Sequence, residues 1–424
     1  MDYVKTYGNL IKKTMDGHPV AARRMVNFGL AEESFRIGHF PPKEMPQALK
    51  VLDSQSLANV NAALKNPQSS CWTNIFAPVE LMQCFDLRCV SMECLASFLS
   101  GFKIEDALVN EAEAEGIAPT LCSYHKSFIG GTGSSILPDA RLYVTTSLAC
   151  DGNINTFRYV GERRGVPGFV IDIPDQYSQE ALDYLVAQER ELIGFLQERT
   201  GVSFDIDRLR ETIRRENASR ACYRRYLGEI RHRFYPKTLT LEMFLLFATH
   251  LDIGTKQTLD FFRLLEEDVK KYPERKGKAI FWVHMLPYYQ QTLQEYMNYK
   301  EDYYIQACDM NLDYMEKMDA DHPLQALARK MILNTYNGSY DRKIRNVARM
   351  VSYLGSDAVI NFCHWGCKQS SGGVMLLKEE MRKRCIPMLV LDGDALDRRN
   401  SHDGQIRTRL EAFLEMIDTM GESK

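Results

Sequence analysis

Short apolar segments alternate with helical stretches along most of this chain, and that alternation limits the folds open to it. RLYVTTS (141–147) and GFVIDIP (168–174) are rich in β-branched residues and have the length of buried strands. The pattern returns nearer the C-terminus in KAIFWVHM (278–285), DAVINF (357–362) and IPMLVLDGD (386–394). Helical patterns lie between or after these segments at 105–115, 177–199, 341–354, 373–384 and 404–418. Strands separated by helices in this way predict βαβ units and an α/β fold with parallel sheets.

Two stretches without strand patterns divide the chain into four predicted parts. Residues 1–66 predict a helical N-terminal lead-in, and residues 203–272, which are charged and helical throughout, predict a helical connector. The strands then fall into an N-terminal α/β lobe over residues 67–202 and a C-terminal α/β lobe over residues 273–424. Because 424 residues exceed the size of one ordinary core, two Rossmann-like lobes are the expected architecture.

Charge and hydropathy exclude several kinds of protein. The net charge of −3 lacks the basic excess of nucleic-acid binders, and in residues 203–272 basic and acidic side chains alternate, as on a solvated helix face. Apolar runs such as EMFLLFA (242–248) are shorter than the roughly 20 residues of a membrane-spanning helix. The first residues, MDYVKTYGNLIKKTMDG, show neither the apolar core nor the cleavage site of an export signal. We therefore expect a cytoplasmic protein with no nucleic-acid or membrane partner.

Eleven cysteines remain to be explained, because disulfides are rare in the cytoplasm. Cys122 follows the turn GIAPT, and Cys150 ends the segment that contains the strand at 141–147. Cys363 directly follows the strand DAVINF, and Cys367 lies four residues further on. Ligands of open parallel sheets bind beyond the carboxyl ends of the strands. Thiols from both lobes can therefore converge on one cleft between them.

The chemistry of these thiols is left open by spacing alone. Thiolates favour iron–sulfur clusters, zinc or Cu(I), but the dispersed positions fit neither a zinc ribbon nor a ferredoxin motif. Buried free cysteines also serve as small apolar core residues. Core packing is the favoured interpretation for seven of them: Cys71, Cys84, Cys89, Cys94, Cys222, Cys308 and Cys385. For the four cysteines near strand ends, a ligand role and core packing remain equally open.

One glycine-rich segment, GGTGSS (130–135), lacks the Lys-Ser/Thr ending of a phosphate-binding P-loop. No strand pattern leads directly into it. It therefore predicts a flexible loop.

Three of the cysteine segments together resemble a known family. LCSYHKSFIG, VTTSLACDGN and NFCHWGCKQSSGG, in that order, resemble the 2-hydroxyacyl-CoA dehydratase family, which includes 2-hydroxyglutaryl-CoA dehydratase (D-component) subunits and, more distantly, benzoyl-CoA reductase subunits. FAPVELMQCFDLRCV looks like the family's Pro-x-Glu helix followed by a strand. The resemblance covers about residues 70 to 420. It implies two flavodoxin-like domains that carry one 4Fe–4S cluster on three cysteines.

The resemblance also implies which residues hold that cluster. Cys122 matches the family's first ligand and Cys150 its second. The third ligand follows the strand of the C-terminal lobe, where both Cys363 and Cys367 are available; Cys363 is favoured because it is nearer the strand end. Cys367 is then expected next to the cluster, where it would tune the potential of the cluster.

The implied reaction is the elimination of water from a 2-hydroxyacyl-CoA thioester through a ketyl radical. Family members receive one electron from an ATP-dependent iron–sulfur activator protein and pair with a related second subunit or with themselves. Here Glu93, or alternatively Glu80, is the candidate for proton transfer, and His364 is the second catalytic candidate. Further contacts to the cluster or the acyl group are expected from Lys368, Gln369 and Ser370.

Two alternatives to this activity stay open. The cysteines at positions 71, 84, 89 and 94 leave room for a larger cluster, as in double-cubane or benzoyl-CoA-type reductases. A non-catalytic electron-relay subunit is the other alternative. The sequence does not determine the acyl group, because selectivity depends on the shape of the pocket.

Overall fold

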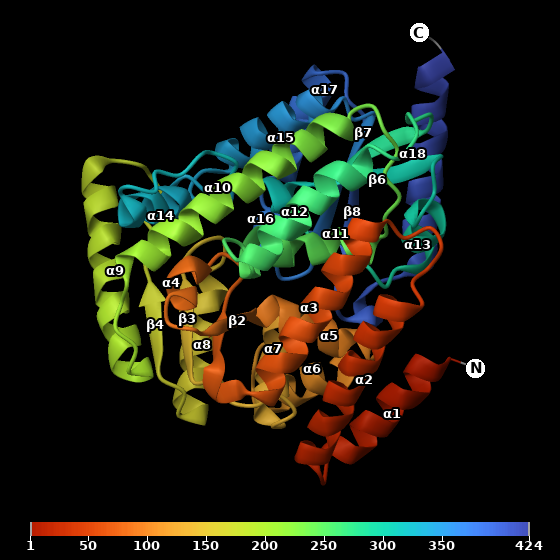
Figure 1. The fold of residues 1–424 in the computed structure, drawn as a ribbon. Coiled ribbons are helices and arrows are strands. Elements are labelled where there is room, and N and C mark those ends of the chain that lie inside the picture. Colours follow the sequence, from red (N-terminus) through yellow and green to blue (C-terminus); the bar gives the residue numbers. More distant parts are fainter. Residues whose placement is uncertain (1, 423–424) are drawn as a thin grey trace.

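The computed structural model describes residues 2–422, and within them the strands form two four-stranded parallel sheets (Figure 1). The first has the order β2-β1-β3-β4 and the second the order β6-β5-β7-β8. Both orders are the first four strands of a flavodoxin-like winding, in which the chain reverses direction beside the first strand. The predicted α/β class with two parallel lobes is therefore confirmed. The strands are β1 (Ser70–Thr73), β2 (Arg88–Ser91), β3 (Leu142–Thr146), β4 (Gly168–Ile171), β5 (Lys278–Val283), β6 (Tyr303–Cys308), β7 (Ala358–His364) and β8 (Met388–Gly393).

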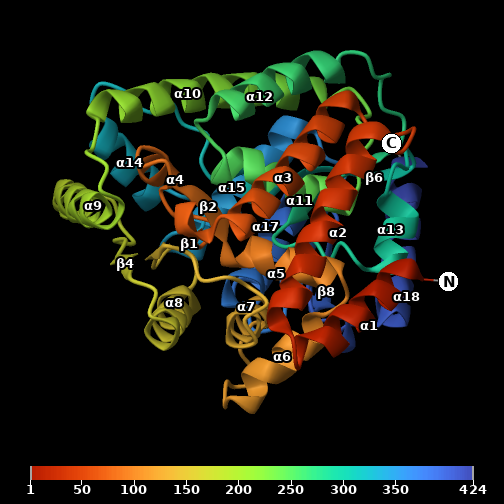
Figure 2. The ribbon, with the colours of Figure 1, turned by 60° about the horizontal axis from the view of Figure 1, so that its bottom comes forward.

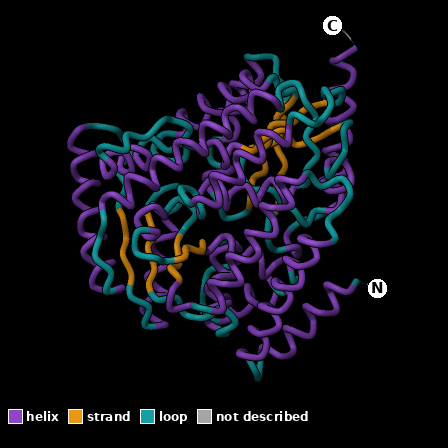
Figure 3. Tube along the Cα trace, in the orientation of Figure 1, coloured by secondary structure: helices purple, strands orange, loops and turns teal. Residues whose placement is uncertain are grey.

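Helices surround both sheets, which stand apart as two groups of strands in Figure 3. In the N-terminal lobe they are α4 (Val79–Gln83), α5 (Met92–Gly101), α6 (Glu105–Ala114), α7 (Ser123–Gly133), α8 (Asp151–Arg164) and α9 (Gln179–Thr200). In the C-terminal lobe they are α13 (Gln291–Met297), α14 (Pro323–Ile332), α15 (Tyr340–Leu354), α16 (Lys368–Ser371), α17 (Val374–Lys383) and α18 (Asp403–Glu422). Short 3-10 turns cover Pro67–Ser69, Asp309–Leu312 and Arg398–Asn400.

The helical lead-in packs on the helical connector. The lead-in consists of α1 (Tyr3–Met15), α2 (Pro19–His39) and α3 (Gln47–Lys65), and the connector consists of α10 (Ile206–Glu229), α11 (Leu239–Leu246), a π-helical turn (Phe247–Leu251) and α12 (Lys256–Val269). In Figure 2, α10 and α12 lie together along one side of the molecule. Buried Asp268 of α12 accepts a hydrogen bond from the Ala48 backbone N–H of α3 at 3.0 Å. This bond satisfies a donor of the first turn of α3, which no preceding carbonyl can reach.

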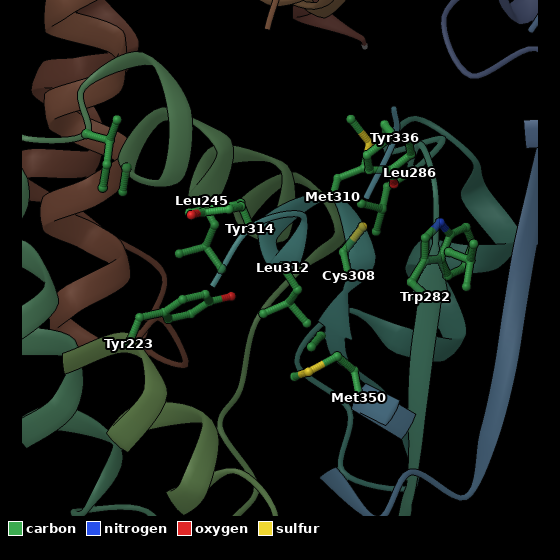
Figure 4. Close-up of a cluster of buried hydrophobic side chains, with 14 of the residues drawn as sticks. Tyr223, Leu245, Trp282, Leu286, Cys308, Met310, Leu312, Tyr314, Tyr336 and Met350 are labelled. Atoms are coloured by element: carbon green, nitrogen blue, oxygen red, sulfur yellow. The ribbon is translucent and has the colours of Figure 1, made fainter. Parts of the chain in front are cut away.

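The connector also shares a core with the C-terminal lobe. Figure 4 shows Tyr223 of α10 and Leu245 of α11 beside Leu312, Cys308 and other buried side chains of that lobe. Cys94, Cys222 and Cys308 are buried, as predicted for core packing. None of the helices that the structure describes is long and apolar enough to cross a membrane.

The structure differs from the local predictions at three places. The segment GGTGSS was predicted to be a loop, but residues 130–133 lie in α7. Glycine is needed there for close packing: a Cβ atom on Gly130 would lie 1.9 Å from the carbonyl oxygen of Leu108 in α6. Strands β1 and β6 were also not predicted, although β1 is buried throughout and β6 is buried after Tyr303.

Candidate functional site

A cavity of about 210 Å³ lies where the two lobes and the connector meet. Each part of the chain contributes to its wall. The N-terminal lobe contributes Phe98 and Cys122, the connector Met243 and Phe247, and the C-terminal lobe His284 and Cys367, among others. A cavity at this junction is the arrangement expected for a ligand between two α/β lobes.

The winding of the sheets explains why thiols reach this cavity. The chain reverses direction between β1 and β3 in one sheet and between β5 and β7 in the other. Cys150 follows β3 as the N-cap residue of α8, and Cys367 follows β7 as the N-cap residue of α16. Cys122 is the N-cap residue of α7. These three cysteines line the cavity together.

The two lobes touch at the glycine of the CHWGC segment. Gly366 has a φ of +80°, a left-handed conformation that glycine adopts without strain. A Cβ atom on Gly366 would lie 2.7 Å from the backbone nitrogen of Cys122. Only glycine therefore allows the loop of the C-terminal lobe to carry Cys367 this close to the thiol of the N-terminal lobe.

Each of the three thiols faces the Nε2 atom of a buried histidine. The distances from Sγ to Nε2 are 3.1 Å for Cys122 and His364, 3.7 Å for Cys150 and His125, and 3.2 Å for Cys367 and His284. The histidines come from both lobes: His125 from α7, His284 from the end of β5 and His364 from β7. The same type of contact therefore recurs at all three sulfur atoms.

The hydrogen bonds of His364 settle which of its nitrogens carries the proton. Its Nδ1 atom accepts the backbone N–H of Ala395 at 2.9 Å, so the Nε2–H donates toward the sulfur of Cys122. The Nδ1 atom of His125 lies 2.8 Å from the Thr156 hydroxyl.

The third histidine, His284, has an unusual backbone. Its φ of +75° lies in the left-handed region, which a residue with a Cβ atom adopts only at a cost in free energy. The backbone N–H of His284 donates to Asp309 at 2.6 Å and holds this conformation. Its Nδ1 atom has no partner among residues 2–422. Strain of this kind is typical of functional positions, and here it directs the imidazole to Cys367.

Burial disfavours the charged forms of Cys122, Cys150 and the histidines. It raises the pKa of Cys122 well above its usual value and that of Cys150 to about 11, and the nearby Cys367 sulfur raises both pKa values further. Burial also lowers the pKa of His125 to about 4 and that of His284 well below its usual value. A bound cation reverses this balance by stabilising thiolates.

Cys363 lies on the other side of β7. The strand continues to His364, so Cys363 and His364 point to opposite faces. The Cys363 sulfur donates to the Ser370 carbonyl oxygen at 3.4 Å and accepts from Asn361 at 3.3 Å. Burial raises the pKa of Cys363 to about 11. Among the described residues, Cys363 is not part of the cavity lining, whereas Cys367 is.

The neighbours of Cys367 differ in their placement. Gln369 lines the cavity, and Lys368 is exposed. The buried Ser370 hydroxyl accepts the backbone N–H of His364 at 3.0 Å and donates to the Cys367 carbonyl oxygen at 2.9 Å. Ser370 therefore fixes the loop that carries Cys367.

The two glutamates considered for proton transfer are in different places. Glu93 lines the cavity, and its Oε2 atom is buried with no hydrogen-bond partner in the described part of the chain. Burial raises the pKa of Glu93 to about 7, although hydrogen bonds from backbone N–H groups and Ser91 act against this rise. Glu80 is fully buried in a salt bridge with Lys330 and does not contribute to the cavity lining formed by residues 2–422.

The additional cysteines of the N-terminal lobe are spread over several elements. Cys71 and Cys89 are register partners on β1 and β2, and Cys84 donates to the Glu80 carbonyl oxygen at 3.3 Å. Cys94 and Cys308 do line the cavity. The Cys308 thiol donates to the His284 carbonyl oxygen at 3.3 Å, and burial raises the pKa of Cys94 well above its usual value.

Sequence reasoning did not identify His125 and His284 as site residues. His284 is the second-last residue of the segment KAIFWVHM and directly follows β5, so it stands at a strand end just as the cysteines do, and this position was the available signal. His125 lies within the CSYH segment one helical turn after Cys122, on the same face of α7.

The comparisons with known proteins agree with the sequence motifs. A profile of the family described as "2-hydroxyglutaryl-CoA dehydratase, D-component" matches residues 74–417. The (R)-phenyllactyl-CoA dehydratase alpha subunit of Clostridium sporogenes is 23% identical over 382 residues, which cover 83% of this chain and 90% of that protein. The (R)-2-hydroxyisocaproyl-CoA dehydratase alpha subunit of Clostridioides difficile is 23% identical over 408 residues, which cover 89% of this chain and 97% of that protein. A benzoyl-CoA reductase subunit of Thauera aromatica is 21% identical over 378 residues, which cover 80% of this chain and 86% of that protein. The predicted resemblance and the predicted class of enzyme are therefore confirmed: this chain belongs to the 2-hydroxyglutaryl-CoA dehydratase D-component family.

Proposed function

We propose that this chain is the iron–sulfur subunit of a cytoplasmic 2-hydroxyacyl-CoA dehydratase. It eliminates water from a 2-hydroxyacyl-CoA thioester through a ketyl radical, after one-electron reduction by an ATP-dependent activator protein. The observation that carries this proposal is the convergence of Cys122, Cys150 and Cys367, from two lobes, on one interlobe cavity. Membership of a dehydratase family agrees with it.

The donor set fits a 4Fe–4S cluster. Soft thiolates are the preferred ligands of iron–sulfur clusters, and these three sulfurs come from separate segments whose positions only the fold brings together. We propose Cys122, Cys150 and Cys367 as the ligands, with Cys367 in place of Cys363, whose sulfur is turned toward Ser370. Three protein ligands leave one iron open, and a cluster bound there supplies a single electron and a Lewis-acid site for the thioester.

The histidines orient the three thiolates. The His364 Nε2–H points at the Cys122 sulfur, and its Nδ1 atom is anchored by Ala395. Both ring nitrogens are engaged, so His364 acts as a positioning residue and not in proton transfer. Hydrogen bonds of this kind fix ligand geometry and change the electron density on sulfur.

Glu93 is the group proposed to accept the proton from C3 of the acyl chain. Glu93 lines the cavity, its buried Oε2 atom is unpaired in the described structure, and its pKa of about 7 lets it exist as a carboxylate at neutral pH. A base whose pKa lies near the working pH combines availability with proton affinity. Glu80 is not a candidate for this role, because its carboxylate is occupied by Lys330.

A second subunit is proposed from the surface of the lead-in. Tyr3 of α1 is 78% exposed, Phe28 of α2 is 67% exposed, and Phe40, directly after α2, is 70% exposed. Phe35 of α2 is also exposed. Exposed aromatic side chains gathered on one helical pair are typical of a protein–protein interface. The relatives named alpha subunits belong to enzymes of more than one subunit, in agreement with a related partner or a second copy of this chain.

The test is iron and sulfide analysis after anaerobic purification. We expect about four iron and four sulfide per chain, and turnover of a 2-hydroxyacyl-CoA with the activator, ATP and partner subunit. Cys122→Ser, Cys150→Ser and Cys367→Ser are expected to lose iron and activity together. Cys363→Ser and Cys222→Ser, both buried controls, are expected to retain both.

Other outcomes separate the alternatives. Full iron content in Cys367→Ser together with iron loss in Cys363→Ser would contradict the proposed ligand set. About twice the expected iron, with reduction of a substrate in place of dehydration, would favour a double-cubane or benzoyl-CoA-type reductase. A normal cluster with no binding of acyl-CoA would favour an electron-relay subunit.

A further inference from the structure

We propose that the cavity accepts a 2-hydroxyacyl group whose side chain is apolar and uncharged, either branched aliphatic or aromatic, and rejects one that carries a second carboxylate. This inference rests on the proposed function, because it names the substrate class of that same site. It follows from what forms the cavity wall and from what that wall lacks.

One part of the cavity wall is built from aromatic rings that contact one another. Phe98 of α5 lies 5.7 Å from Phe244 and 5.9 Å from Phe247, measured between ring centroids, and Phe244 and Phe247 are also 5.9 Å apart. Offset and edge-on contacts at these distances stabilise an aromatic cluster beyond its burial alone. Met243 and Met310, which line the same cavity, add flexible apolar surface. The three phenylalanines therefore form a pre-formed apolar surface for an acyl side chain.

No lysine or arginine belongs to the cavity lining formed by residues 2–422. The charged residues that do line it are two glutamates, Glu93 and Glu242. Glu242 already has its partners: Lys237 bonds one carboxylate oxygen, and the Cys308 backbone N–H donates to the other at 2.9 Å. Lys237 is therefore already paired with Glu242, does not belong to the cavity lining, and does not bind a ligand there.

A carboxylate on the far end of the acyl chain would thus lose its water without gaining a cation. Burying an unpaired charge is strongly unfavourable, and the Glu93 carboxylate would add repulsion. A hydrocarbon side chain loses nothing comparable and gains the free energy of burial against the aromatic wall. The cavity therefore separates these two classes of acyl group by charge and not by length.

A second hollow extends the site outward. A groove of about 1200 Å³ runs along α1 and α2 and shares Phe98, Gly101 and Phe244 with the cavity. A Cβ atom added at Gly101 would meet nothing within 4 Å, so this position opens into empty space between the two hollows. The aromatic wall is thus the boundary that an acyl group meets on the side of the groove.

The first experiment compares two thioesters of opposite class. Calorimetric binding to the anaerobically prepared holoenzyme, and kcat/KM with the partner subunit and activator, are measured for 2-hydroxyisocaproyl-CoA and 2-hydroxyglutaryl-CoA. We expect the dicarboxylic substrate to bind and react at least about 100-fold less well. Equal or better use of 2-hydroxyglutaryl-CoA would overturn the inference and leave the proposed function standing, whereas no binding of either thioester would overturn both.

The second experiment supplies the missing cation. Met243 lines the cavity and is only half-buried, so Met243→Lys keeps an unbranched stem and adds one positive charge, while Met243→Gln is the neutral control. We expect Met243→Lys to shift the ratio of the two Kd values toward 2-hydroxyglutaryl-CoA by at least about tenfold and Met243→Gln to leave the ratio unchanged. An equal shift in both variants would show that charge is not what the cavity discriminates, and the inference would fail.

Discussion

Replacing Lys330 with methionine tests how the walls of the cavity are held together. Lys330 on α14 bonds Glu80 of α4 and Glu216 of α10, the latter at 3.1 Å, so one cation joins both lobes and the connector. Both carboxylates are fully buried, and the lysine side chain is 15% exposed. Methionine preserves most of the apolar stem and removes only the charge.

The expected cost follows from that burial. Removing one partner of a buried ion pair costs about 3–5 kcal/mol, because the remaining carboxylate must either keep an uncompensated buried charge or take up a proton. Glu216 keeps Arg220 at 2.7 Å, so most of the effect falls on Glu80. Burial already raises the pKa of Glu80 to about 7, although Lys330 acts against this rise. Loss of Lys330 raises that pKa further, so Glu80 in the folded variant stays protonated at neutral pH. Stability is then lost as pH rises from the ordinary glutamate pKa toward the raised one, and the cost is larger at pH 8 than at pH 6.

Urea unfolding at these two pH values measures the effect, with Lys256→Met as the matched control. Lys256 pairs with Asp260 on the surface of α12, where the lysine is 81% exposed, and its removal is expected to cost no more than about 0.5 kcal/mol. The reasoning is refuted if Lys330→Met is no more destabilising than Lys256→Met, or if its cost grows as the pH falls.

Three further predictions concern the site itself. His364→Asn keeps an acceptor for the Ala395 N–H but cannot reach Cys122. The iron content is therefore expected to remain, while the midpoint potential of the cluster becomes more negative. An unchanged potential would show that the Nε2–H has no influence on the sulfur. Glu93→Gln is expected to lower kcat by about 100-fold or more with little change in acyl-CoA Kd. The kcat of the unsubstituted enzyme is expected to rise with pH through about 7 as Glu93 ionises. A pH-independent kcat over this range would contradict the role of Glu93 as base. Gly101→Leu places a side chain in the open space beside the aromatic wall. It is expected to lower kcat/KM for phenyllactyl-CoA more than for lactyl-CoA, whereas Gly101→Ala is expected to stay close to the unsubstituted enzyme. An equal loss for both thioesters would mean that the aromatic wall does not bound the acyl site.

Much of the fold was predictable because β3, β5 and β7 are buried along almost their whole length, and the partly buried strands β4 and β8 are also largely apolar. The segments that became β3, β4, β5, β7 and β8 are continuous apolar runs, and such runs are typical of parallel sheets. Two strands were missed: β1, SCWT, is only four residues long, and β6, YYIQAC, contains Gln306, which weakens the apolar pattern. In the structure the side chain of Gln306 is buried and donates to the carbonyl oxygens of Ile230 and Leu354, a long-range solution that no local pattern reveals.

The candidate site was partly predictable for a related reason. Their positions after a turn and a strand made Cys122 and Cys150 candidates, the family resemblance implied that they are ligands, and both line the cavity. The choice between Cys363 and Cys367 depended on where β7 ends. The predicted strand stopped at Phe362, but the structure continues it to His364, so Cys363 is still within the strand. Successive strand residues point to opposite faces, so a strand two residues longer than predicted changes which side chains reach the cavity, and strand ends cannot be placed that closely from sequence.

The contacts between histidine and cysteine were beyond sequence reasoning altogether. His364 and Cys122 are 242 positions apart, and His284 and Cys367 are 83 apart. Such pairs arise only when both sheets and the connector are assembled. The same is true of the apolar character of the cavity, whose aromatic wall combines one residue of α5 with two from α11 and the turn that follows it.

Mössbauer spectroscopy of the anaerobically purified protein, grown with iron-57, tests the central claim most directly. Three thiolate ligands from Cys122, Cys150 and Cys367 predict a single 4Fe–4S cluster in which one iron differs from the other three and responds to added acyl-CoA. The same spectrum is expected from Cys363→Ser, because its sulfur lies on the other face of β7. Four equivalent iron environments, or a changed spectrum in Cys363→Ser, would contradict the account.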